Sequence, residues 1–207
     1  MKRKKLPLGI LETNCYILEN ESERIIIDPG SEHEHIIEAM RASDKKVAGI
    51  LLTHAHFDHI GAIDAISDYF NCDVYMSEIE KYFLTDPEKN GSAKFIQYGI
   101  EPITVNTKPK YLNTGHNVLG TFTFDVKHTP GHSPGSLSFI FDDFAIVGDT
   151  LFKEGIGRTD LYEGNTSQLL NSITRELLSL RDDVVICPGH GPDTTVKYEK
   201  LNNPYLK

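Results

Sequence analysis

One short segment, residues 54–59, restricts the possible fold and chemistry of this chain more than any other segment. It follows directly on the apolar run 47–52 and reads His54-Ala55-His56-Phe57-Asp58-His59. The run predicts a buried strand, and the residues after the segment, 60–70, are helix-like. Strands followed by helices build α/β proteins, which keep their chemistry at the carboxyl ends of the strands. Imidazoles and carboxylates bind zinc, iron or manganese, so the segment predicts a metal site at a strand end.

Length, composition and charge narrow the class of protein. The 207 residues, 39% hydrophobic and 25% charged, are compatible with one domain spanning positions 1–207. The formal net charge of −9 disfavours nucleic acid or an anionic membrane as a partner. No apolar stretch is long enough to span a bilayer, and the one after the basic residues 2–5 is too short for a signal peptide. Three widely separated cysteines argue against a disulfide framework, which predicts a reduced, cytoplasmic setting.

The alternation of strands and helices extends along both halves of the chain. Apolar runs and period-two alternation predict strands at 4–8, 14–18, 25–28, 47–52, 73–76, 122–126, 136–141, 144–147 and 184–187. Helical spacing predicts helices at 33–41, 60–70 and 166–180. Helices that cover strands in both halves favour an α/β sandwich of four layers, αββα, in which two sheets pack face to face with helices outside.

The segment between residues 77 and 110 is less regular. Ser77-x-x-Glu80 resembles a capping box, which predicts that a helix begins there and runs to Leu84. Prolines and glycines then recur from residue 85 to residue 110. Because these residues interrupt helices and strands, we expect this stretch to be a long irregular excursion near the metal site.

Three further metal-binding candidates lie far along the chain from the first segment. His132, Asp149 and His190 each follow a predicted strand, and glycine or proline lies near each of them. Such small, turn-forming residues let the backbone approach closely and fix the side chain. An imidazole or carboxylate left unpaired at a buried strand end costs free energy unless a counter-charge is bound. Together with residues 54–59, these three residues therefore predict a shared metal centre.

In identity, order and spacing these residues resemble the signature of the metallo-β-lactamase superfamily. That signature is H-x-H-x-D-H followed by a distant His, an Asp and a final His, and the resemblance runs from Leu6 to His190. It implies the αββα fold and two divalent metal ions, with zinc expected ahead of iron or manganese. The implied ligands are His54, His56 and His132 for one metal, Asp58, His59 and His190 for the second, and Asp149 bridging both.

Short segments are similar to the compact glyoxalase II-like branch of that family. They are Thr13-Asn14-Cys15-Tyr16, Ile27-Asp28-Pro29-Gly30, Gly157-Arg158-Thr159-Asp160 and Pro188-Gly189-His190-Gly191-Pro192. That branch hydrolyses thioesters such as S-lactoylglutathione to a hydroxy acid and a free thiol. The resemblance implies a small-molecule thioester substrate, a metal-bound hydroxide as nucleophile, and Asp58 as the catalytic residue that orients it. Only residues 191–207 follow His190, so we expect no C-terminal helical domain of the kind that contacts glutathione in full-length glyoxalase II.

Residues outside the ligand set are candidates for binding the substrate. Arg158 either binds a substrate carboxylate with its fixed fork of donors or forms a surface pair with Asp160. Lys153 and Tyr111 are further, weaker candidates. We also expect Asp28 to support the centre by accepting a hydrogen bond from a ligand imidazole.

Other activities found on the same fold provide competing interpretations. A persulfide dioxygenase, which is an oxidoreductase, shares a Gly-Arg-Thr-Asp segment and would bind one iron through His54, His132 and Asp149. Residues 188–192 favour the hydrolase instead. A nuclease is disfavoured by the net charge, and another ester or lactone hydrolase is an open alternative. A non-catalytic metal-binding protein is disfavoured by the complete ligand set.

Overall fold

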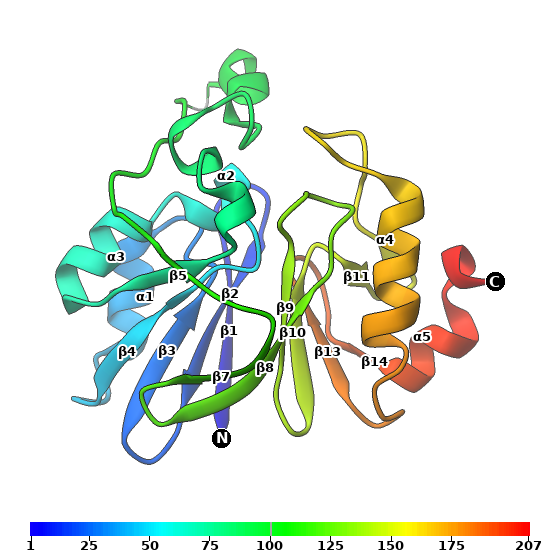
Figure 1. Ribbon diagram of the computed structural model, residues 1–207. Coiled ribbons are helices and arrows are strands. Elements are labelled where there is room, and N and C mark those ends of the chain that lie inside the picture. Colours follow the sequence, from blue (N-terminus) through cyan, green and yellow to red (C-terminus); the bar gives the residue numbers. More distant parts are fainter. Residues whose placement is uncertain (100) are drawn as a thin grey trace.

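The computed structural model describes residues 1–99 and 101–207, which form two six-stranded β-sheets with helices outside them (Figure 1). Helices α1 (His33–Met40) and α3 (Ile63–Phe70) cover the first sheet, and α4 (Thr166–Ser172) and α5 (Val196–Asn202) cover the second. This arrangement is the predicted αββα sandwich. Among the described residues, no helix combines the length and apolarity that crossing a bilayer requires.

The first sheet is built by the N-terminal half of the chain in the order β1-β2-β3-β4-β5-β6. The bounds of these strands are Lys2–Leu8, Thr13–Glu19, Glu23–Ile27, Lys46–Leu51, Val74–Met76 and Lys110–Tyr111. Strands β1 to β3 pair antiparallel, whereas β3 to β6 pair in parallel. Strand β4 ends just before His54, so the histidine-rich segment lies at the carboxyl edge of the parallel part of this sheet.

The second sheet is built by the C-terminal half in the order β14-β13-β10-β9-β8-β7. From β7 to β10 the bounds are Gly115–Leu119, Phe122–His128, Leu137–Ile140 and Phe144–Gly148, and those of β13 and β14 are Val185–Pro188 and Thr194–Thr195. Strands β10 and β13 are parallel, and the other neighbours are antiparallel. A separate small hairpin of β11 (Leu151–Phe152) and β12 (Gly155–Ile156) follows β10.

Burial on both faces explains why several strands read as continuous apolar runs. In β2, Tyr16 and Leu18 pack between the two sheets, where they join Phe139 of the second sheet. The alternate residues Cys15 and Ile17 pack on the other face, in the cluster that includes α1 and α3. Because successive side chains of a strand point to opposite faces, a strand covered on both sides needs apolar residues at every position.

Most predicted elements are confirmed, and some differ in extent. The predicted helix 60–70 is divided into α2 (Phe57–Ile60) and α3, so the first part of the helical structure already begins inside the histidine-rich segment. The predicted helix 166–180 consists of α4 and a π-helical turn, Ile173–Leu177. Strands β7 and β14, the β11–β12 hairpin and helix α5 have no counterpart in the sequence-based prediction.

The predicted helix from Ser77 to Leu84 is wrong. Two short 3₁₀ helices, η1 (Glu78–Glu80) and η2 (Phe83–Thr85), stand in its place. The Ser77 hydroxyl accepts a hydrogen bond from the Ile79 N–H at 3.3 Å, but the Glu80 side chain turns into the protein interior instead of completing the capping box. In the stretch 85–110, the structure contains η3 (Ser92–Tyr98) and β6, and residue 100 lies outside the described residues.

Candidate metal centre

The residues of the predicted centre meet at one edge of the sandwich. Those of the first sheet come from a single segment, residues 54–59, which joins the end of β4 to the first turn of α2. Those of the second sheet follow three different strands, β8, β10 and β13. The complete set is His54, His56, Asp58, His59, His132, Asp149 and His190. The fold therefore brings all the predicted ligands together from four separate loops.

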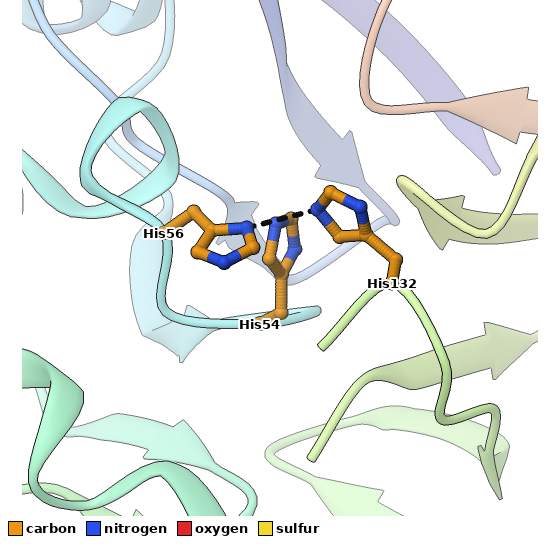
Figure 2. A group of neighbouring side chains, drawn as sticks. All are labelled: His54, His56 and His132. Atoms are coloured by element: carbon orange, nitrogen blue, oxygen red, sulfur yellow. Dashed lines mark hydrogen bonds between the residues drawn. The ribbon is translucent and has the colours of Figure 1, made fainter. Parts of the chain in front are cut away.

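The candidate ligand atoms form three overlapping groups. These are His54, His56 and His132; His54, His59 and Asp149; and Asp58, His59 and His190. Within each group all ligand atoms lie within 4.8 Å of one another. Figure 2 shows the first group, in which Nδ1 of His56 and Nε2 of His132 face each other at 2.8 Å. Groups that overlap in this way are consistent with two neighbouring metal ions.

Four of the imidazoles form a hydrogen bond through Nδ1, the ring nitrogen that faces away from the centre. Nδ1 lies at hydrogen-bonding distance from Thr53 Oγ1 for His54 (3.1 Å), Asp28 Oδ2 for His59 (2.9 Å), the Arg158 carbonyl oxygen for His132 (2.8 Å) and the Leu11 carbonyl oxygen for His190 (3.0 Å). An acceptor at Nδ1 places the proton there and leaves the lone pair of Nε2 facing the centre. These rings are therefore oriented as metal ligands.

Asp28 has the supporting contact that the sequence predicted. Its carboxylate accepts hydrogen bonds from His59 and from both the N–H and the hydroxyl of Thr53, at 2.8 Å and 2.6 Å. Its backbone has a φ of +52°, a conformation that costs free energy for a residue other than glycine. Because Thr53 in turn contacts His54, this one carboxylate orients imidazoles of two different ligand groups.

Asp149 lies between the ligand groups, in a position suited to bridging. Its Oδ1 is 3.4 Å from His59 Nε2, and its Oδ2 is 3.6 Å from His132 Nε2 and 3.4 Å from His190 Nε2. The close approach of the next loop requires glycine at position 189. A Cβ atom there would be 2.1 Å from Asp149 Oδ1 and 2.8 Å from a carbon of the His59 ring. Any larger residue would therefore displace the Asp149 carboxylate.

Asp58 is held in place by a residue of the second strand. The Thr13 hydroxyl donates a hydrogen bond to Asp58 Oδ2 at 2.7 Å. The same oxygen lies 3.5 Å from His59 Nε2 and 3.2 Å from His190 Nε2. The position of the carboxylate is thus fixed from one side by a neutral donor, and its acceptor capacity is directed at the centre.

The electrostatics of the site differ between its ligand groups. Burial opposes protonation of His59 and His190, but the carboxylates of Asp58 and Asp149 raise the pKa of His59 well above its usual range and that of His190 to about 10. Burial, reinforced by the neighbouring imidazoles, lowers the pKa of His54 well below its usual range and that of His56 to about 3. Burial works to raise the pKa of Asp58, but His59 and His190 outweigh it and bring that pKa to about 2. The site therefore presents neutral imidazoles in its first group and an ionised carboxylate in the last.

Unpaired polar atoms in the interior test whether this centre suits a metal. Among the described residues, the buried side-chain polar atoms without a hydrogen-bond partner are Ser31 Oγ, His56 Nε2 and three more, His54 Nε2, His59 Nε2 and Asp149 Oδ1, which bear on the metal. Buried polar groups without partners cost about 1–3 kcal/mol each. All three atoms belong to residues of the second ligand group, His54, His59 and Asp149. A bound cation would satisfy them, so the residues present fit a metal site.

The last ligand, His190, is tied to the beginning of the chain. Asn14 and Tyr16 of β2 donate side-chain hydrogen bonds to the carbonyl oxygen of Pro188, at 2.9 Å and 2.7 Å. The Asn14 amide also donates to the carbonyl oxygen of Gly191 at 2.9 Å. The loop that carries His190 is thus fastened to the opposite sheet on both sides of the ligand.

A cavity of about 400 Å³ opens on the centre. Besides ligands, it is lined mainly by apolar side chains, namely Leu11, Phe57, Phe95, Phe152, Ile156 and Leu161. A second cavity of about 220 Å³ shares Leu11, Phe57 and Asp58 with it and continues toward Ile10 and Ile103. Asp58 therefore lies between two hollows with apolar walls.

The predicted substrate-binding residues have different positions relative to this cavity. Arg158 lines it, but its guanidinium donates to both carboxylate oxygens of Asp160, at 2.7 Å and 2.8 Å. Neither Lys153 nor Tyr111 is in the wall of the cavity. Lys153 instead places its ammonium 5.3 Å from the centre of the Tyr198 ring, and Tyr111 belongs to the edge strand β6. The surface pair with Asp160 is thus the alternative that the structure shows for Arg158.

Sequence reasoning missed two polar residues of the site. Thr13 appeared only as part of a segment similar to glyoxalase II, and its contact with Asp58 carried no local signal. Glu80 was assigned to a helix cap, although its buried side chain reaches the loops of His54 and His132. Both residues act across long sequence separations, which patterns of nearby residues do not reveal.

A comparison with known protein families agrees with this geometry. Residues 8–190 match the family model described as the metallo-beta-lactamase superfamily. The chain belongs to this superfamily. The matched range includes strands β2 to β13 and all seven residues of the candidate centre.

Individual members of the superfamily resemble the chain over nearly its full length. The probable metallo-hydrolase YqgX of Bacillus subtilis is 41% identical, covering 100% of this chain and 98% of that protein. The hydroxyacylglutathione hydrolase GloC of Haemophilus influenzae is 35% identical, covering 97% of this chain and 96% of that protein. Among solved structures, the BLEG-1 B3 metallo-beta-lactamase has 42% identity and a TM-score of 0.94, covering both chains completely. A di-iron-bound form of TTHA1623 has 33% identity and a TM-score of 0.84, covering 98% of this chain and 100% of that one. This chain is therefore a probable metal-dependent hydrolase.

Proposed function

We propose that the chain hydrolyses thioesters with two divalent metal ions, as a glyoxalase II-like enzyme. The observation that carries this proposal is the overlap of three ligand groups beside an apolar cavity. The similarity to GloC supports the choice of a thioester. The donor set of imidazoles and carboxylates suits zinc or iron, and a similar solved structure holds two irons.

The residues have distinct tasks in this proposal. His54, His56 and His132 would hold one metal, Asp58, His59 and His190 the other, and Asp149 would lie between them. Such metals supply a Lewis acid for the carbonyl group and lower the pKa of water to about 7. Asp58, fixed by Thr13, would orient the attacking hydroxide.

The wall of the cavity suits a thiol leaving group. Among the described residues that line it, there is no lysine or tyrosine to protonate a leaving group. A thiolate, with a pKa of about 8.5, leaves without a general acid. The apolar walls and the pairing of Arg158 with Asp160 favour substrates whose acyl and thiol parts are uncharged and apolar.

A panel of substrates tests the proposal. The protein is loaded with zinc or iron, its metal content is measured, and turnover is compared for neutral thioesters, S-lactoylglutathione, a lactone and a β-lactam. Thioesters are expected to have the highest kcat/KM, with neutral apolar ones ahead of S-lactoylglutathione. Hydrolysis of the β-lactam alone would overturn the proposal in favour of the activity named for BLEG-1. Oxygen consumption with glutathione persulfide, without thioester hydrolysis, would establish the dioxygenase instead.

A further inference from the structure

Glu80 is a fully buried carboxylate to which the proposed chemistry assigns no task. It is 0% exposed. Its Oε2 accepts a hydrogen bond from the Ala55 N–H at 2.7 Å, and its Oε1 accepts one from the Gly135 N–H at 2.7 Å. The Ser133 hydroxyl donates a further, short hydrogen bond to Oε1. All three partners are donors, which matches an ionised carboxylate.

The three donors belong to the loops that carry the first ligand group. Ala55 lies between His54 and His56 in the loop after β4, and Ser133 directly follows His132 in the loop between β8 and β9. These loops come from different sheets. The Glu80 carboxylate therefore connects the two sheets beside the three imidazoles shown in Figure 2.

Burying a carboxylate at this place costs free energy of folding, because the charged group loses its hydration. Burial raises the pKa of Glu80, and the hydrogen bonds from Ser133, Gly135 and Ala55 oppose that rise. Among the described residues, no lysine, arginine or histidine forms an ion pair with it, so these neutral donors supply most of what offsets its desolvation, with a smaller contribution from the charge of His59. Apolar side chains would join two loops at lower cost, which indicates that the directed hydrogen bonds serve a purpose.

The surrounding chain leaves room for this carboxylate. A Cβ atom at Gly135 would lie 2.8 Å from Glu80 Cγ and 2.9 Å from Ser77 Oγ. Glycine at position 135 thus allows the backbone N–H to approach Glu80 closely. The turn at Ser77, the side chain of Glu80 and the loop after His132 form one packed unit.

We propose that Glu80 is a positioning residue that sets the spacing of His54, His56 and His132 and thereby tightens the binding of the metal held by those three. The proposal rests on the ligand assignment of the proposed function, but not on the substrate. Its test measures metal binding alone, so that a failure to hydrolyse thioesters would leave it standing.

The chain offers a matched control in Glu199. This carboxylate is also 0% exposed and also accepts three hydrogen bonds, from the Glu154 N–H, the Thr194 hydroxyl and the Asn203 amide, at 3.0, 2.6 and 2.8 Å. Glu199 belongs to α5, and none of its three donors lies in a loop that carries a candidate ligand. Glu80→Gln and Glu199→Gln therefore make the same chemical change in two buried carboxylates, and only one of them faces the centre.

The decisive experiment is a chelator competition on the two variants and the wild type, each loaded with two equivalents of cobalt(II). Glutamine keeps one acceptor oxygen but turns an NH₂ group toward a donor, so one of the two loops is released. Glu80→Gln is expected to raise the dissociation constant of one of the two metal ions by about 10- to 100-fold. The dissociation constant of the other ion is expected to change by less than about threefold. Glu199→Gln is expected to leave both unchanged. Equal weakening of both equivalents in Glu80→Gln, or of neither, would overturn the proposal.

Two further variants identify the equivalent and guard against misfolding. In a His190→Ala background, which removes a ligand of the other group, Glu80→Gln is expected to weaken the metal that is left. If Glu80→Gln does not fold, Ser133→Ala removes one donor and keeps the carboxylate, with an expected loss of about tenfold at the same equivalent. An unchanged affinity in a folded Ser133→Ala protein would count against the proposal.

Discussion

The first and the third ligand groups, His54, His56 and His132 on the one hand and Asp58, His59 and His190 on the other, differ in charge and in access to solvent. His54, His56 and His132 are 2–3% exposed, and burial lowers the pKa of each below its usual range. In the other group, Asp58 brings a negative charge and the His190 side chain is 28% exposed. A closed, neutral set of imidazoles suits retention of a metal, whereas a charged, open set suits exchange of water and substrate. We therefore expect the first group to retain its metal and the other group to carry out the chemistry.

The largest effect is expected for Asp58→Ala. If the open group carries out the chemistry, kcat should fall by about a thousandfold or more, because the variant loses both a ligand and the group that orients water. Steady-state kinetics on protein with measured metal content provide the test. Turnover close to that of the wild type at full metal occupancy would show that Asp58 has no such task.

Removal of the metals by a chelator is expected to distinguish the two ligand groups without any mutation. When a chelator is added to the loaded protein, release is expected in two phases, with the fast phase at least about tenfold faster than the slow one. The fast phase should belong to the open group, because solvent reaches His190 but not the three buried imidazoles. Stopped-flow measurement of released zinc, in parallel with activity, tests this. A single phase would mean that both groups are equally accessible.

Thr13→Val tests how the open group is positioned. The change removes the hydroxyl that donates to Asp58 at 2.7 Å while keeping the shape of the side chain. Loss of a hydrogen bond to a charged group costs about 1.5–3 kcal/mol, which corresponds to a decrease in kcat of about 10- to 100-fold. Thr107→Val is the matched control, because its hydroxyl donates to Asp64 at 2.6 Å and that carboxylate is outside the centre. Equal losses in both variants would rule out a specific effect on Asp58.

The smallest effect is expected for Arg158→Ala. The guanidinium is already paired with Asp160, and the contact that orients His132 comes from the backbone carbonyl of Arg158, which the variant keeps. We expect KM to change by less than about threefold for neutral and charged thioesters alike, because a surface ion pair is worth about 0–1 kcal/mol. A loss of tenfold or more confined to charged thioesters would instead show that Arg158 binds a substrate carboxylate.

The sequence predicted the fold and the clustering of the seven candidate ligands because both have local signals. Apolar runs ended at turns that carried His, Asp and glycine, and strand ends in an α/β fold share an edge. The misassigned Glu80 shows where this reasoning stops. Ser77 and Glu80 have the spacing of a helix cap, yet the donors that determine the conformation of Glu80 lie at positions 55, 133 and 135. Those contacts exist only once both sheets have packed, so no local pattern could reveal them.

The fastening of the His190 loop to β2 has a consequence for the order in which the protein matures. Asn14 and Pro188 are 174 positions apart, and their hydrogen bond joins the start of the chain to its last ligand. During synthesis the first sheet emerges long before this partner exists. The candidate ligands in residues 54–59 are therefore completed by His190 only after the loop that follows β13 has docked on β2. A chain interrupted before position 188 lacks a complete set of ligands. The newly made protein therefore has its full set of candidate ligands only after residue 190 has been synthesised.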